Sequence, residues 1–534
     1  MDYTHPSACL DLLQRLHPID FKATHQTLVQ IVRGLLEGRP APNQHLEVLE
    51  AARDTLSFAQ GEMARRYAAH PLPPDSEENA TLGRVIALWQ DMARSYARIA
   101  DADASEGTLE DQRALLMQRR ILYEGLALIE YFRAHRALEP GMWRTLHSSY
   151  ASAREQGLAR IRVSEPLNET WRAQSPHEAY VAILLVDLAN PYGRSERELG
   201  WIVRWAQRFA PYCAVDAELE SSKSTTYGVD FELDQGLRPL GLLARTPSLM
   251  RFDGAALATQ IQAVMAQFKR GVKPASLGLG EDCSTGDAGR LLLSLYRPWG
   301  LAAAGRRFPR RSRAGEVELT GDWLGMGFAI QGALFQQPRT ASPHRPRADD
   351  IALLTFRERA TLVSDPQREL QRRKEQAEML GLECERWGLL DQSVGGFRLQ
   401  RRSDTSRLEH HQLIAIRPPD GEQFLLGDLS WLMYRAEGTL EIGVNVLPGI
   451  PRVLAIRQTS NGSREPYHQA FLLPASPALK SDASLVLPAQ WFRRGRMLEL
   501  WQDGVARKIE LTKLLLRGAN FDQCSFDEVA PNPA

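Results

Sequence analysis

The stretch GRRFPRRSRAGEVEL, residues 305–319, marks the point at which the chain changes character. Before it, from about residue 10 to 300, apolar side chains recur mostly at the spacing of one helix face, as in Val85, Leu88, Trp89, Met92, Tyr96 and Ile99. After it, apolar and polar residues alternate, as in Leu440, Ile442, Val444 and Val446. The sequence therefore predicts a multidomain α+β protein, with a mainly α-helical N-terminal half followed by antiparallel strands.

The helical half contains further amphipathic stretches and one exception. Apolar residues keep the helical spacing from Leu115 to Ile129 and again from Leu257 to Phe268. Thr225–Leu233 alternates like a strand, so this half is not expected to be purely helical. The most apolar run, Ala179–Ala189, contains Asp187 and is too short to span a bilayer.

The β-rich half is interrupted once. Val317 and Leu319 begin the strand pattern, which resumes at Phe397 and Leu399. Between them, residues 337–350 are rich in Pro, Arg and Ser and predict a linker, and residues 369–382 predict a charged helix. A last alternating stretch, residues 485–516, predicts a small C-terminal β module.

Composition excludes several classes of protein. The 534 residues carry 65 Lys and Arg against 65 Asp and Glu, and 43% are apolar, which is typical of a globular chain without a general affinity for nucleic acid or membranes. The five cysteines are widely spaced and form neither a disulfide framework nor a zinc motif. The opening residues MDYTHPSACLDLL lack the basic and apolar regions of a secretory signal. We expect a cytoplasmic protein.

The familiar catalytic motifs are missing from the sequence. Gly278–Gly286 has the glycines of a phosphate-binding loop but not its lysine. His410 and His411 fall between two predicted strands, where adjacent side chains point to opposite faces and chelate one metal poorly. We therefore expect no enzyme activity, no metal and no resident cofactor.

Residues 306–313 contain five arginines and no acid. A guanidinium is a permanent cation whose fork of donors suits phosphate or the O6/N7 edge of guanine, and it can stack on a base. Two arginines four positions apart, just before a strand, would suit one phosphorylated, purine-bearing ligand. A solvated basic linker is the alternative explanation of such a cluster.

Two motifs in order resemble the signature of PilZ domains, the bacterial receptors for the second messenger cyclic di-GMP. Arg306 and Arg310 match the RxxxR motif, and the DxSxxG motif is present as Asp391, Ser393 and Gly396. The resemblance covers roughly residues 300–460 and includes the strand patterns LIAIR, LLGDLSWL and LEIGVNVLPG. It implies an antiparallel six-stranded β-barrel and a cyclic di-GMP site.

The family assigns each matching residue a role. Arg306 and Arg310 would contact phosphates and guanine edges and stack on the bases, with Arg307 as an auxiliary cation. Asp391 and Ser393 would form hydrogen bonds with a guanine from the other side of the ligand. Gly396 would permit a tight turn or a close backbone approach that a side chain would block.

The resemblance also implies a division of the chain. We expect a mainly helical region at 1–298 as the interaction or output domain, a PilZ-like barrel at 299–460 interrupted at about 335–385, and a β-rich extension at 461–534. In PilZ domains the two motifs usually lie a few tens of residues apart, whereas Arg310 and Asp391 are much further apart here. An insertion within the barrel explains the excess, and inserted chain can cover or distort the pocket.

Four functions remain open from the sequence. The leading one is a non-enzymatic receptor in which cyclic di-GMP binding changes contacts between the helical region and an unknown protein partner. The main alternative is a degenerate PilZ-like scaffold that binds no nucleotide. A nucleic-acid binder is disfavoured by the overall neutrality and by the single aromatic residue, Phe308, among the arginines. An enzyme hidden in the helical half has no residue pattern in its favour.

Overall fold

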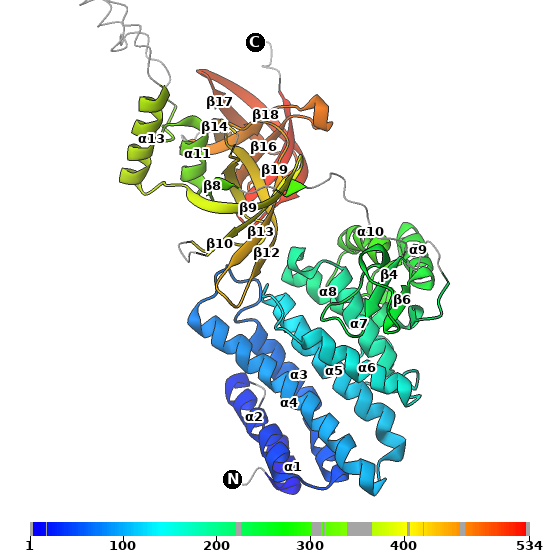
Figure 1. Ribbon diagram of the computed structural model, residues 1–534. Coiled ribbons are helices and arrows are strands. Elements are labelled where there is room, and N and C mark those ends of the chain that lie inside the picture. The colour runs from blue at the N-terminus through cyan, green and yellow to red at the C-terminus, as the bar shows by residue number, and fades with distance from the viewer. Residues whose placement is uncertain are drawn as a thin grey trace, which may run out of the picture. The chain divides into compact units, whose positions relative to one another are not determined.

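The chain divides into two compact units in a computed structural model that describes residues 4–17, 19–220, 226–300, 311–312, 315–338, 366–402, 406–419, 421–459 and 465–529. The first unit comprises Met1–Arg307 together with Met433–Gly438, and the second comprises Phe308–Leu432 and Thr439–Ala534. The first is mainly helical and the second mainly β (Figure 1). The fold class predicted from the sequence is confirmed.

The first part of the helical unit is built on one apolar core. Residues such as Leu28, Leu56, Val85 and Tyr96 are fully buried there, on faces with the spacing expected of amphipathic helices. Pro71, Pro73 and Pro74 lie between the third and fourth helices. The helices are α1 (Pro6–Gln14), α2 (Phe21–Gly38), α3 (Pro42–Ala64), α4 (Ser76–Glu106), the short 3₁₀ turn η1 (Glu110–Gln112) and α5 (Arg113–Arg133).

The second part of the unit surrounds α7 (Pro176–Leu188), the apolar run noted in the sequence. Eleven consecutive residues of α7, Pro176–Val186, are buried, because neighbouring helices and strands share a core with it. None of the described helices is both long and apolar enough to cross a bilayer. The other helices are α6 (Met142–Glu155), η2 (Pro191–Gly193), α8 (Glu196–Phe209), η3 (Ala210–Tyr212), η4 (Leu240–Leu242), α9 (Ala255–Lys269), η5 (Ala275–Leu277) and α10 (Thr285–Gly300).

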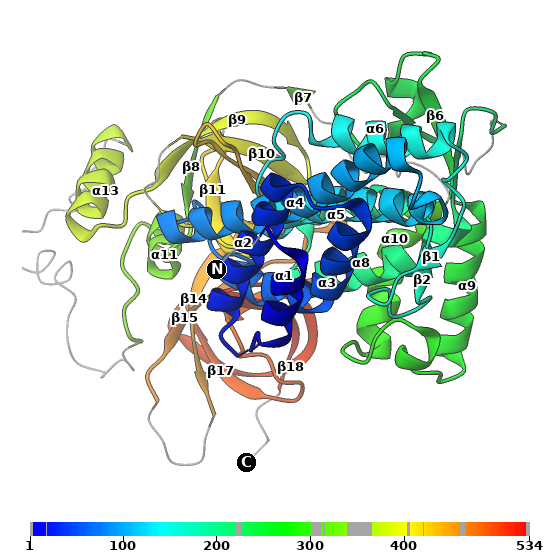
Figure 2. The same ribbon diagram turned by 90° about the horizontal axis from the view of Figure 1, so that it is seen from below.

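Short strands accompany these helices, as the alternation at Thr225–Leu233 predicts. β4 (Tyr227–Asp230) lies in a four-stranded sheet of order β3-β6-β4-β5, and its Val229 is fully buried. The sheet lies beside α9 and α10 (Figures 1 and 2). The strands of the unit are β1 (Val163–Ser164), β2 (Ala173–Gln174), β3 (Ala214–Asp216), β4, β5 (Arg238–Pro239) and β6 (Leu249–Asp253).

The first barrel of the second unit is a closed ring. Antiparallel pairing runs β10-β13-β12-β11-β8-β9, and β9 also pairs with β10, so six strands of the described chain join end to end. β7 pairs with β9 near the C-terminal end of that strand, at Asp391 and Gln392. The strands are β7 (Arg311–Ser312), β8 (Glu316–Thr320), β9 (Glu385–Ser393), β10 (Gly396–Arg401), β11 (Leu413–Arg417), β12 (Leu425–Tyr434) and β13 (Leu440–Val446).

The interruption of this barrel lies between β8 and β9. α13 (Pro366–Leu380) confirms the charged helix expected there, and most of the expected linker lies outside the described residues. An additional helix, α11 (Trp323–Gln331), was not predicted. Asp322 caps its N-terminus by accepting from Gly325 N at 2.6 Å, and Met326 is fully buried.

The C-terminal β module is a second closed barrel, of strand order β14-β15-β16-β19-β18-β17. It begins at Arg452, ahead of the boundary expected at residue 460. Phe471 and Phe521 of this barrel share a core with Leu413 and Leu426 of the first barrel. Its elements are β14 (Arg452–Gln458), β15 (His468–Leu473), η6 (Pro477–Leu479), β16 (Ser484–Pro488), β17 (Met497–Gln502), β18 (Val505–Arg517) and β19 (Phe521–Glu528).

Candidate ligand site

The DxSxxG motif forms the hairpin between β9 and β10. Asp391 and Ser393 are the last part of β9, Val394 and Gly395 make the turn, and Gly396 opens β10. The register pairs Ser393 with Gly396 and Asp391 with Arg398, and a bulge follows beyond Arg398. Bulges bend and twist a strand locally, so this one sets the direction of the hairpin end.

Gly396 lies where no side chain fits. A Cβ on Gly396 would stand 2.2 Å from the Val444 carbonyl oxygen of β13, well inside van der Waals contact. Gly396 pairs with Asn445 of the same strand. The close approach is therefore to the backbone of the neighbouring strand β13.

Asp391 and Ser393 are partly buried beside a cation that the sequence analysis did not select. Nη1 of Arg398 lies 4.0 Å from Oδ2 of Asp391, and its Nη2 donates to Oε2 of Glu441 at 2.8 Å. The Ser393 hydroxyl donates weakly to the Gly396 carbonyl at 3.4 Å. Nε of Arg398 is buried without a hydrogen-bond partner within the described part of the chain. The hairpin thus offers an acid, a hydroxyl and an unused guanidinium donor.

Arg306, Arg307 and Arg310 lie outside the described residues. The chain directly after them is described, and it runs beside the second motif. β7 pairs antiparallel with β9, with Arg311 opposite Gln392 and Ser312 opposite Asp391. β8 continues this pairing along the first half of β9, with Glu316 opposite Gly388.

The two adjacent histidines differ from their expected geometry. His410 and His411 lie in a turn, where His411 has a φ of 59°, and their ring centroids are 4.0 Å apart. The prediction that they point to opposite faces was wrong, because the alternation rule holds only inside a strand. His410 Nε2 lies 3.2 Å from the Ser430 carbonyl, and His411 Nδ1 lies 3.1 Å from Asp428 Oδ1. In the described ranges no cluster of three or more His, Cys, Asp or Glu is placed to hold a metal ion.

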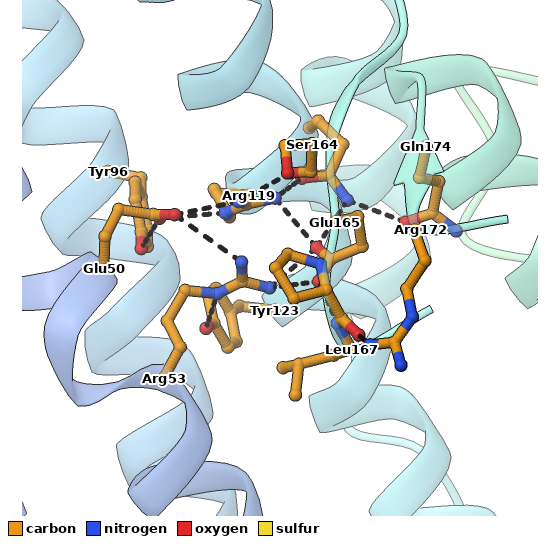
Figure 3. Close-up of polar contacts among 12 residues, drawn as sticks. Glu50, Arg53, Tyr96, Arg119, Tyr123, Ser164, Glu165, Leu167, Arg172 and Gln174 are labelled. Carbon is orange, nitrogen blue, oxygen red and sulfur yellow. Dashed lines mark hydrogen bonds and ion pairs between the residues drawn. The ribbon is translucent and has the colours of Figure 1, made fainter. Parts of the chain in front are cut away.

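The helical unit holds a buried charged network between α3, α5 and the turn after β1 (Figure 3). Arg53 donates to both carboxylate oxygens of Glu165 at 2.7 Å. Arg119 donates to Glu165 at 2.8 Å and, through two nitrogens, to Glu50 at 2.9 and 2.8 Å. Tyr96 donates to Glu50 at 2.7 Å.

Charge balance indicates that this network is structural. Two guanidinium groups face two carboxylates, and each group is bonded inside the network, which leaves little capacity for a ligand. Burial favours the neutral acid at Glu50, but the hydrogen bond and charge of Arg119 outweigh it and hold the pKa of Glu50 below its ordinary value. The network was not predictable from the sequence, because its members are far apart along the chain.

Two models of known protein families match this chain, one in its N-terminal part and one in its C-terminal part. The family model described as "Cyclic-di-GMP receptor FimW, N-terminal domain" matches residues 7–219, in the helical unit. The model described as "FimW C-terminal beta-barrel domain" matches residues 454–529, in the second barrel. The cyclic-di-GMP receptor FimW of Pseudomonas aeruginosa is 21% identical over 547 aligned residues, covering 95% of this chain and 88% of that protein. The resemblance to a receptor family with a long helical N-terminal region is therefore confirmed, and the chain is similar to the cyclic-di-GMP receptor FimW over almost its whole length.

Proposed function

We propose that this chain is a receptor for cyclic di-GMP, with the ligand held between the arginine segment and the β9–β10 hairpin. One observation carries the proposal: β7 places Arg311 opposite Gln392 and Ser312 opposite Asp391. Arg310 is covalently joined to Arg311, and this supports a site that both motifs would share. The receptor name of the similar protein and of the N-terminal family model supports the same ligand.

The residues of the site suit the chemistry of the ligand. Arg306, Arg307 and Arg310 would contact phosphate oxygens and guanine edges, because a guanidinium binds both in bidentate fashion. Asp391 accepts hydrogen bonds from the N1–H and N2–H edge of a guanine, and the Ser393 hydroxyl donates or accepts nearby. Gly396 keeps the hairpin tight against β13.

Ligand binding acts on a protein partner through the helical unit in this proposal. Residues Met433–Gly438, which join β12 to β13, are counted with that unit. Tyr434 N donates to the His135 carbonyl and Ala137 N to the Tyr434 carbonyl, both at 2.9 Å, and the Arg136 guanidinium lies 4.6 Å from the Tyr434 ring centroid. β13 pairs with β10, so the chain runs from the candidate site directly into this segment.

Competition binding tests the proposal. A fluorescent cyclic di-GMP analogue is titrated into the full chain and displaced with unlabelled cyclic di-GMP, with GTP as the control. Asp391→Asn keeps the shape of the side chain but removes its charge, and we expect about tenfold weaker binding because a charge-assisted hydrogen bond is lost. Folded wild-type protein that shows no displaceable binding would instead favour the scaffold without nucleotide binding.

A further inference from the structure

The helical unit contains a basic pocket that is separate from the proposed cyclic di-GMP site. It has a volume of about 290 Å³ and lies where the α2–α3 connection meets the C-terminal part of α4. Its walls include Arg39, Ala41, Pro42, His45, Arg98 and Glu106. The size is near the lower limit for small-molecule sites, so a small ligand fits best.

Two arginines line this pocket. Arg39 lies in the α2–α3 connection and Arg98 on α4, and neither forms an ion pair with any described acidic side chain. Glu106 is the one acid of the lining. The lining therefore carries a net positive charge of one, and cations that lack a protein counter-charge attract an anion from solution.

His45 is a buried residue of the pocket wall. The residue is only 2% exposed, and its Nε2 atom has no hydrogen-bond partner within the described ranges. A buried ring nitrogen without a partner costs free energy, which a bound ligand can recover. Burial and then the charge of Arg98 lower the pKa of His45 to about 4, so the ring is neutral at pH 7.

The N-terminus of α3 lies at this pocket. Pro42 is its first residue, the preceding Ala41 offers no side-chain cap, and the first turn contains no acid. Helix N-termini present backbone N–H groups and a partial positive charge, and they are usually capped by an oxygen. Pro42 has no N–H and Asn43 Oδ1 already accepts from Gln44 N at 2.9 Å, so Asn43 N is the first-turn donor that remains for a ligand oxygen.

We propose that this pocket binds a small anion carrying a phosphomonoester group. Arg39 and Arg98 would bind the phosphate oxygens. The N-terminus of α3 would face one of these oxygens, and Nε2 of the buried His45 would form a hydrogen bond with the phosphate. The site lies in the helical unit and stands independently of the cyclic di-GMP proposal. Through this pocket the helical unit would bind a small molecule other than cyclic di-GMP.

The first test follows the His45 ring by ¹³C NMR of the full chain, with the signal assigned by its loss in His45→Gln. Inorganic phosphate and glycerol 3-phosphate are the probes, and sodium chloride at equal ionic strength is the control. We expect a saturable shift of the His45 signal with both phosphates and none with chloride. An unchanged His45 signal, or equal shifts with chloride, would overturn the proposal.

Three variants separate binding from folding. Arg39 has a left-handed φ of 52°, which glycine adopts without strain, so Arg39→Gly should melt no earlier than wild type while binding phosphate about tenfold more weakly. Arg98→Gln should weaken binding similarly. Arg94→Gln removes an arginine on the same helix outside the pocket and should leave binding within about twofold. Equal losses of phosphate affinity in all three variants would contradict a specific site at Arg39 and Arg98.

The same phosphomonoester chemistry occurs in free metabolites and in lipid headgroups. Sedimentation with vesicles containing phosphatidic acid distinguishes the two sources. The pocket volume favours a free anion, so we expect no cosedimentation beyond that with vesicles of phosphatidylcholine alone. Cosedimentation that Arg98→Gln abolishes would overturn the free anion in favour of a lipid headgroup.

Discussion

Ser312 and Asp391 are direct partners in the antiparallel pairing of β7 with β9. They stand far apart in sequence, on either side of the interruption between β8 and β9, yet their backbones lie side by side. The interruption therefore leaves the end of the arginine segment next to the DxSxxG hairpin. The unusual spacing of the two motifs is compatible with this pairing, because the extra residues lie in the connection between β8 and β9, and these two strands still pair with each other.

Replacing Gly396 tests the close approach of β10 to β13. Gly396→Ala places a methyl group 2.2 Å from the Val444 carbonyl oxygen. Since a backbone atom cannot rotate away, we expect a loss of about 1–3 kcal/mol in the free energy of unfolding of the second unit, measured by urea denaturation.

Gly388→Ala is the matched control for that substitution. Its nearest contact would be the Gln400 Cγ atom at 3.5 Å, an ordinary van der Waals distance on the same strand pair. We expect a change too small to separate from wild type. Equal destabilisation by both alanines would show that the hairpin is not packed as described.

The buried network of the helical unit predicts a large effect at Glu165. Glu165→Gln leaves the Arg53 and Arg119 guanidinium groups short of a counter-charge in a buried site. Breaking one side of a buried ion pair typically costs about 3–5 kcal/mol, and thermal and urea unfolding would measure it. Glu110→Gln removes an acid from an exposed pair with Arg113 and should change stability by under about 1 kcal/mol. Similar small effects at both positions would refute the structural role of the network.

The stability of the helical unit should fall in mild acid because His177 is buried. Burial, followed by the charge of Arg160, lowers the pKa of His177 to about 4 from an ordinary 6.5. Because the folded pKa is depressed, the unfolded chain takes up the proton first, so stability is complete above pH 6.5 and is lost as the pH falls toward 4. Between pH 7 and pH 5 this amounts to about 2 kcal/mol.

His177→Gln isolates the contribution of this histidine. The ring accepts from the Tyr150 hydroxyl and donates to the Cys213 carbonyl, so the variant should be less stable at pH 7. It should nevertheless lose less stability than wild type between pH 7 and pH 5 in urea titrations. Parallel losses in the two proteins would assign the acid sensitivity to other groups.

Much of the architecture was predictable because periodicity reports burial directly. The stripe from Val85 to Ile99 became one face of α4, and the alternation from Leu440 to Val446 became β13. α11 escaped prediction because its Gly325 and Gly327 disfavour helices, whereas packing against both barrels stabilises it.

Contacts set by register were not predictable from composition. Arg398 faces Asp391 only because of where the β9–β10 pairing starts, which sequence alone does not fix. The start of the second barrel at Arg452 did have a signal, since Pro448, Gly449 and Pro451 precede it and Gly449 has a φ of 109°. Of the candidate site, the chemistry of the residues was readable from the sequence, whereas the pairing of β7 with β9 was not.

Calorimetric titration of the full chain with cyclic di-GMP is the decisive measurement for the proposed receptor. Wild type is compared with the Arg306→Ala/Arg310→Ala double variant and with Arg493→Ala/Arg494→Ala, a pair of exposed arginines in the second barrel that serves as the matched control. We predict micromolar or tighter binding by wild type and by the control pair, and a loss of at least about a hundredfold in the Arg306/Arg310 variant. Absence of binding heat from folded wild-type protein, or equal affinity in all three proteins, would contradict a receptor built on these two motifs.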